Sequence, residues 1–147
     1  MATFCYNNVE RLMKVVNSPF DVVNTGWILK DMDNMRGAVI LLSICKEYKE
    51  YEEVKVDVIK KIVNKYRDWM KSVEEGLLWD ADKIVPFFNG KKLAALFNVS
   101  TGTMVKYLVD HQSSWQFKNP TKTKEDYAAY VRENREVILE ELSAKKQ

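Results

Sequence analysis

The stretch VKVDVIKKIVNKYRDWMKSVEE, residues 54–75, carries the clearest periodic pattern in the chain. Its apolar side chains recur every three or four positions among charged ones: Val56, Ile59, Ile62, Val63, Tyr66, Trp69, Met70 and Val73. This spacing places them along one face, because an α-helix repeats about every 3.6 residues. The stretch predicts a long amphipathic helix that ends at Gly76, after which residues 77–79 pack against neighbouring helices.

The same spacing continues towards the amino terminus. Apolar residues at three- and four-residue intervals predict a helix over 9–16. Ser18 is expected to cap a second helix, with Pro19 at its first position and its last apolar residue at 29. Asp33-Asn34 is expected to cap a third helix over 35–48.

The carboxy-terminal part predicts three more helices. A short helix is expected over 91–97 after an Asn89-Gly90 turn, and a longer one over about 103–117, capped by Ser100 or Thr101. Thr123 and Asp126 have the spacing of a capping box, which predicts a last helix ending at about 142. Since no segment alternates like a strand, we predict an all-α bundle of about six to seven helices. Residues 1–84 would form a helical body and 85–147 a lysine-rich helix-turn-helix tail packed on it, as one continuous globular unit.

Composition narrows the class of protein. The chain has 147 residues, of which 46% are hydrophobic and 30% charged, with only 5 glycines and 3 prolines. This is typical of a soluble helical domain. No apolar run approaches the roughly 18 residues of a membrane span, and residues 1–8 lack the features of a signal peptide, so we expect an intracellular protein without membrane contact. Cys5 and Cys45 are far apart and are expected to be idle or buried thiols.

Charge is unevenly distributed. Residues 83–124 contain seven lysines and a single acid, Asp110, whereas the rest of the chain has 16 basic and 20 acidic residues. A local positive excess can bind phosphates. It is equally consistent with a solvated lysine-rich surface, and charge alone does not decide between the two.

Groups able to carry catalysis are scarce. His111 is the one histidine, and spacing assigns it no partner. The pairs Asp31/Asp33 and Asp80/Asp82 have the spacing of metal-binding carboxylates, but both lie at expected helix starts, where capping is the better interpretation. The sequence has no glycine-rich nucleotide-binding loop. We therefore expect no catalytic residue, no metal site and no cofactor in this chain.

The segment VPFFNGKKLAALFNVSTGTMVKYL, residues 85–108, and the residues that follow it resemble a known family. Pro86 to Lys91 give an apolar run followed by Asn-Gly-Lys, and Leu93 and Gly102 follow. The pattern closes with Trp115-Gln116-Phe117, Asn119-Pro120 and a Thr-Lys-Glu-Asp start to the last helix. These motifs resemble the carboxy-terminal body and tail of eukaryotic-type CCA-adding enzymes, the tRNA nucleotidyltransferases related to bacterial poly(A) polymerases. The resemblance is best over residues 86–130.

The resemblance implies a function for the lysines. In that family an all-helical body and tail hold the tRNA elbow and the acceptor–T arm, while an amino-terminal catalytic head adds CCA to the 3′ end. The resemblance therefore implies tRNA as a partner, together with a head domain or subunit that would bind Mg²⁺, CTP and ATP. The implied RNA-binding residues, with Lys91 foremost, are Gly90, Lys91, Lys92, Gly102, Lys106, Lys118, Lys122 and Lys124.

Two roles remain open for each glycine and for the tryptophan. Gly90 and Gly102 could bring backbone N–H groups to phosphate or simply form ordinary corners. Trp115 could stack on a base, but a core position is the more common role of a tryptophan at the end of an apolar helix.

Three positions depart from the family pattern. Lys92 stands where an acid is usual, Thr103 replaces the proline of a Gly-Pro turn, and Lys106 replaces a small residue. The chain also lacks a catalytic head, so it could be a fragment, a separate subunit or a remnant with a new role.

Two other functions compete with the tRNA-binding hypothesis. A protein–protein interaction module that kept the fold would expose an apolar patch, for which Phe87, Phe88 and Trp79 are the candidates. A small complete enzyme, built on His111 and the aspartate pairs, is the third and weakest alternative.

Overall fold

The computed structural model describes the backbone of residues 2–51, 53 and 55–145, and the side chains within those ranges from residue 6 onward. Over these residues it contains seven α-helices, two 3-10 helices and no strand, so the all-α prediction is confirmed. The chain divides into two compact units, residues 1–83 and 84–147. The expected packing of 85–147 on 1–84 as one globular unit stays a prediction.

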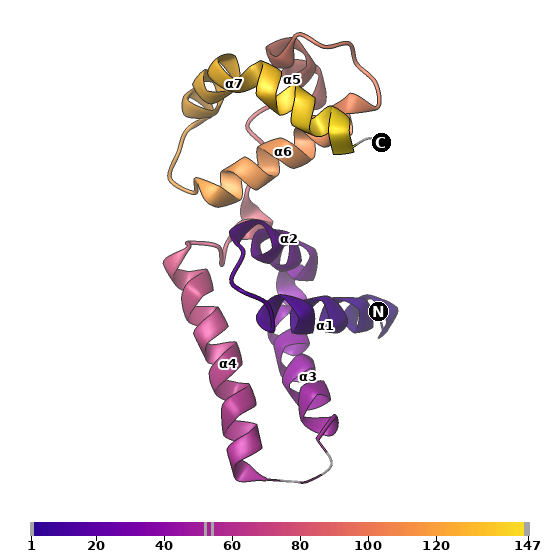
Figure 1. Cartoon of the computed structure of the whole chain (residues 1–147), viewed down its shortest axis with the longest axis vertical. Helices are drawn as coiled ribbons and strands as arrows, with labels where there is room; N and C mark the ends of the chain where they lie inside the picture. The colour runs from indigo at the N-terminus through magenta and orange to yellow at the C-terminus, as the bar shows by residue number, and fades with distance from the viewer. Residues whose placement is uncertain (1, 52, 54, 146–147) are drawn as a thin grey trace. The chain divides into compact units, whose positions relative to one another are not determined.

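The first unit consists of α1 (Ala2–Val16), α2 (Val22–Met32), α3 (Arg36–Lys49) and α4 (Val56–Glu75), with the short 3-10 helices η1 (Asp33–Met35) and η2 (Ala81–Lys83). Helix α1 packs on α2 and α3, and α3 packs on α4 (Figure 1). The apolar stripe of α4 faces this core from Ile62 to Val73, but Val56 and Ile59 at its start are exposed. Position 54, where the sequence placed the start of this helix, lies outside the described residues. Buried side chains of this core include Leu12, Ile28, Leu29, Met32, Val39, Tyr66 and Leu78.

The caps predicted for the starts of the second and third helices are wrong. The Asp21 carboxylate accepts a hydrogen bond from Asn24 N at 2.7 Å, so Asp21 is the cap of α2. Ser18 instead donates its hydroxyl to Lys14 O at 2.7 Å, at the end of α1. Asp33 has φ 47° and ends α2 rather than starting α3. This positive φ is incompatible with an α-helix, so a residue expected at a helix start stands at a helix end.

The prediction that the long helix ends at Gly76 is confirmed, since Gly76 is the C-cap of α4. Leu78 N donates to Val73 O and Leu77 N to Glu74 O, both at 3.0 Å, which is the Schellman pattern. Gly76 is right-handed, and Leu77 takes the left-handed conformation with φ 55°. Leu78 is fully buried, but Leu77 is 59% exposed, so the prediction that residues 77–79 all pack inward is wrong for Leu77.

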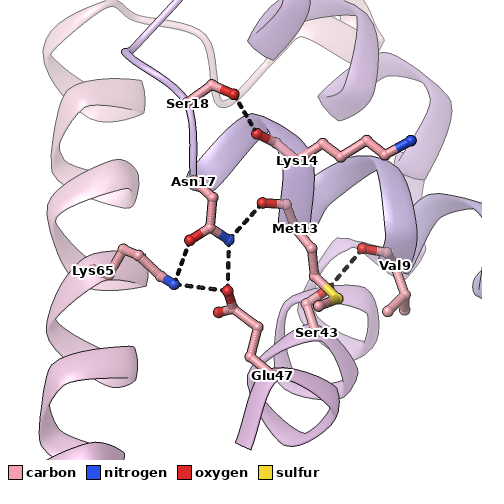
Figure 2. Close-up of polar contacts among 8 residues, drawn as sticks. All are labelled: Val9, Met13, Lys14, Asn17, Ser18, Ser43, Glu47 and Lys65. Carbon is pink, nitrogen blue, oxygen red and sulfur yellow. Dashed lines mark hydrogen bonds and ion pairs between the residues drawn. The ribbon is translucent and has the colours of Figure 1, made fainter. Parts of the chain in front are cut away.

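A polar cluster joins three helices of the first unit (Figure 2). Lys65 of α4 donates to Glu47 Oε1 of α3 at 2.7 Å and to Oδ1 of Asn17, just beyond α1, at 2.6 Å. Asn17 Nδ2 donates to Met13 O at 2.7 Å and also to the Glu47 carboxylate. Glu47 is only 7% exposed, so the Lys65 ammonium balances a charge that would otherwise be buried alone, and the Asn17 amide adds a hydrogen bond to it. Burial and the nearby Glu47 carboxylate raise the pKa of the Tyr66 phenol.

The second unit contains α5 (Gly90–Phe97), α6 (Met104–Lys118) and α7 (Lys124–Lys145), each packed on the other two. The capping box at the start of α7 is confirmed, because Thr123 N donates to Asp126 Oδ2 at 2.8 Å and Asp126 N to Thr123 Oγ1 at 3.3 Å. The hydrogen bonds from Thr123 lower the pKa of the Asp126 carboxyl. The core of this unit comprises Leu93, Phe97, Leu108, Phe117, Tyr127, Val131, Ile138 and Leu142.

Candidate nucleic-acid interface

Asn89 and Gly90 belong to the start of α5 and do not form a separate turn. The Asn89 side chain accepts a hydrogen bond from Lys92 N at 3.0 Å, which makes Asn89 the N-cap and Gly90 the first helical residue. The amide of Lys92 is therefore already used within the chain. The amides of Gly90 and Lys91 have no acceptor inside the helix, since the first turn of any helix lacks such partners.

Gly90 is required by space and not by backbone conformation. Its φ is not positive, but a Cβ at this position would lie 2.6 Å from Val105 Cγ1 of α6. The start of α5 thus approaches α6 so closely that a side chain at this position would force Val105 or the helix to shift. At Gly102, which also lacks a positive φ, a Cβ would meet no atom within 4 Å.

Helix α6 starts without the predicted side-chain cap. Its N-cap residue is Thr103, which makes no capping hydrogen bond through its side chain, so neither Ser100 nor Thr101 has the expected role. The exposed bend that contains Gly102 therefore leads into α6 without a side-chain anchor. The left-handed residue of this connection is Asn98, with φ 54°, at the end of α5.

The starts of α5 and α6 enclose one open hollow of about 670 Å³. Three predicted site residues line it together: Gly90, Lys91 and Gly102. The amino ends of two helices meet there, and both carry partial positive charge. A lysine, first-turn amides and two helix dipoles are the groups that proteins use to bind phosphate.

All six predicted lysines are exposed. Within the described part of the chain, none of them forms an ion pair, whereas several other lysines, such as Lys46 and Lys65, do. The ammonium groups of the six are therefore free for an external anion. The set comprises Lys91, Lys92, Lys106, Lys118, Lys122 and Lys124.

These lysines do not form a single cluster. Lys106 is in the first turn of α6, near the hollow, and Lys124 Nζ lies 5.7 Å from the ring centre of Phe88, two residues before Gly90. Lys118 is at the opposite end of α6, twelve residues or about 18 Å from Lys106 along the helix axis. Lys122 follows in the turn before α7. A partner contacting all of them must extend along the whole of α6, as a nucleic-acid backbone does.

Two glutamines of α6, neither of them predicted to have this role, hold the segment that leads to Lys91. Gln112 is fully buried; its Oε1 accepts from Phe88 N at 2.9 Å and its Nε2 donates to Phe88 O at 3.1 Å. Gln116 donates to Val85 O at 3.0 Å. Glutamines four residues apart on a face that is otherwise apolar are the sequence signal that could have identified them.

The aromatic residues of the second unit form a packed cluster. The Trp115 ring centre lies 5.1 Å from that of Tyr127 and 5.8 Å from that of Tyr130, which favours the core role for this tryptophan over base stacking. Phe87 and Phe88 are half-buried against the same core. Trp79 is also half-buried, with its ring centre 6.4 Å from that of Trp69. The exposed apolar patch expected from Phe87, Phe88 and Trp79 is therefore not present.

His111 and the aspartate pairs have structural partners. His111 Nδ1 lies 3.2 Å from the Tyr127 hydroxyl, and burial lowers the pKa of the imidazole. Asp31 pairs with Arg11, Asp80 with Lys83 and Asp82 with Arg36. The prediction that both pairs lie at helix starts is wrong for Asp31, which is in the last turn of α2. The described residues contain no group of three His, Cys, Asp or Glu side chains that could hold a metal, and Cys45 is an exposed free thiol. The side chain of Cys5 lies outside the described residues.

Among the described residues, no helix is both long and apolar enough to cross a membrane. No protein-family model matches the sequence, and no solved structure gives a significant match. Two curated enzymes do match part of it. The chain is 25% identical over 107 residues to a mitochondrial CCA tRNA nucleotidyltransferase of Candida glabrata. This alignment covers 73% of this chain and 20% of that enzyme. It is also 31% identical over 64 residues to a tRNA nucleotidyltransferase of Schizosaccharomyces pombe. That alignment covers 44% of this chain and 13% of the enzyme.

These matches confirm the resemblance that the motifs between residues 86 and 130 indicated. The chain shares partial sequence similarity with two CCA-adding tRNA nucleotidyltransferases and aligns with a region of each of them. The matched part spans a fifth or less of the length of these relatives.

Proposed function

We propose that this chain is a tRNA-binding region of a CCA-adding tRNA nucleotidyltransferase. It holds the tRNA elbow and acceptor–T arm while a catalytic head, in another domain or subunit, extends the 3′ end. The observation that carries the proposal is the similarity to two such enzymes in a chain whose six exposed lysines, none of them in an ion pair among the described residues, are distributed over α5, α6 and the start of α7. In this arrangement the head binds Mg²⁺, CTP and ATP, and the protein is intracellular.

Binding in this proposal is electrostatic and independent of base sequence. Lys91 and the first-turn amides of α5 hold one phosphate at the hollow, and the lysines towards the far end of α6 contact others. Each lysine–phosphate contact releases counterions, so affinity should fall steeply as salt rises.

The test is the binding of labelled tRNA to this chain between about 50 and 250 mM salt, the range over which counterion release is readily measured. Lys91→Glu/Lys92→Glu should abolish binding. Lys60→Glu/Lys61→Glu is the matched control, because it makes the same charge change at two adjacent exposed lysines of α4. Equal loss of affinity in both double variants would mean that net charge, and not this site, binds the RNA. No binding by the unaltered chain at the lowest salt would refute the proposal.

A second candidate function has one observation in its favour. Helix α3 exposes Ala38, Leu41, Leu42 and Cys45, which share one face by their spacing, and Leu41 is 65% exposed. Such a face favours a protein–protein interaction module. Leu41→Glu separates the two functions, because it should disrupt self-association or partner binding in sedimentation velocity and leave tRNA affinity unchanged.

A further inference from the structure

The segment that precedes α5 is attached to α6 at three successive points. Val85 is bound by Gln116, Phe88 by Gln112, and Gly90 packs against Val105. Eleven residues of α6 separate Gln116 from Val105, a rise of about 16 Å. The five residues from 85 to 90 reach about 17 Å when extended. The segment runs antiparallel to α6 with a bend at Phe87 and Phe88, and the three attachments set its register on the helix.

Gln112 supplies the central and most restrictive attachment. Its amide exchanges two hydrogen bonds with the backbone of a single residue, Phe88, as a neighbouring β-strand would. The two bonds hold the N–H and the C=O of one residue, which belong to successive peptide units, and so fix both the position and the rotation of the backbone at Phe88, which one bond cannot do. A buried glutamine is costly unless it is hydrogen-bonded in this way, and an apolar residue could fill the same place in the core. An apolar residue would not, however, orient the segment.

We propose that Gln112 is a positioning residue for the RNA contact made by Lys91, an inference that rests on the proposed function. Lys91 is three residues beyond Phe88 and directly follows Gly90, which has no room to shift towards α6. By holding Phe88, Gln112 sets where along α6 helix α5 begins. It thereby sets where the Lys91 ammonium and the first-turn amides face the hollow.

The test is a double-mutant cycle between Gln112→Met and Lys91→Ala, measured as tRNA affinity and its salt dependence. Methionine keeps the buried volume and removes both hydrogen bonds. Lys91→Ala should weaken binding several-fold and reduce the slope of log affinity against log salt by about one phosphate contact. Gln112→Met should weaken binding and reduce the slope similarly, yet have a much smaller further effect when Lys91 is already alanine, because only the amide contacts then remain to be displaced. A merely structural role would lower affinity without this dependence on Lys91.

Leu108→Met is the matched control, because Leu108 is a fully buried residue one turn away on α6. It should leave both affinity and slope unchanged. If Gln112→Met does not fold, Gln116→Leu takes its place in the cycle. That variant removes a single attachment and also removes Gln116 Oε1, a buried oxygen without a partner, so it should fold.

The outcomes separate this inference from the proposed function. Loss of binding in Lys91→Ala but full binding in Gln112→Met overturns the positioning role alone. Effects of the two substitutions that add fully overturn it as well. If Lys91→Ala itself has no effect while the unaltered chain binds tRNA, the positioning role falls and the other lysines carry the proposed function. If the unaltered chain does not bind, both are refuted.

Discussion

Replacing Gly90 by alanine tests whether the close approach of α5 to α6 determines this position. The added Cβ would lie 2.6 Å from Val105 Cγ1, well inside van der Waals contact. Val105 is β-branched and in a helix, so its side chain has little rotameric freedom to move aside. Overpacking of this kind costs about 1–3 kcal/mol, and alanine regains about 1 kcal/mol of helix propensity over glycine. The expected net loss of unfolding free energy is roughly 0–2 kcal/mol.

Gly102→Ala is the control for this prediction. No atom lies within 4 Å of its added Cβ and φ is not positive, so this variant should be neutral or more stable. The gain should be about 0.4–1 kcal/mol through the unfolded state. Urea denaturation followed by circular dichroism measures both variants.

Val105→Ala in the Gly90→Ala background completes the test. The smaller side chain removes the clash, so Val105→Ala should cost about 1–3 kcal/mol less unfolding free energy in the Gly90→Ala variant than in the unaltered protein. Additivity of the two substitutions to within about 0.5 kcal/mol would refute the steric explanation. Gly90 would then be a residue of local conformation only.

Three further predictions concern charge and capping. Lys65→Met should lower the unfolding free energy by about 3–5 kcal/mol, because it leaves Glu47 buried without its cation, and adding Glu47→Gln should recover part of the loss in the same denaturation assay. Burial lowers the pKa of His111 in the folded state. The contribution of this residue to stability is therefore fully present above the unfolded-state pKa of 6.5 and is lost as pH falls below that value. A His111→Asn variant should show a shallower decline in stability between pH 7.5 and 5.5. Thr123→Ala should cost about 0.5–2 kcal/mol by removing the cap of α7, and an unchanged melting temperature would contradict the role given to the capping box.

Periodicity was sufficient to predict which segments are helical. The α4 pattern was strong because its apolar residues meet a single core, and the capping box of α7 was readable because both partners lie within four residues. The helix boundaries of the first unit were less predictable. Ser18, Asp21 and Asp33 can all cap a helix, and only their backbone conformations, which depend on tertiary packing, decide which of them does.

The candidate site was predictable in its residues and not in its geometry. The lysines, Asn89 and Gly90 are visible as a motif, but the reason for glycine is the position of Val105, fifteen residues away in the chain. The role of Gln112 likewise depends on a backbone unit 24 residues earlier. Contacts of this kind leave no local pattern, since neither helical spacing nor turn chemistry records which loop passes over a given helix.

The conformation of Leu77 has a consequence for engineering the protein. A left-handed backbone costs a residue with a side chain about 1–2 kcal/mol, and the Leu77 side chain, mostly in solvent, regains little of this through packing. Glycine in this place would relieve the strain without altering the motif that ends α4. A substitution at this single exposed position could therefore make the protein more stable. Such unused stability is common, because natural proteins are selected only to stay folded well enough to work.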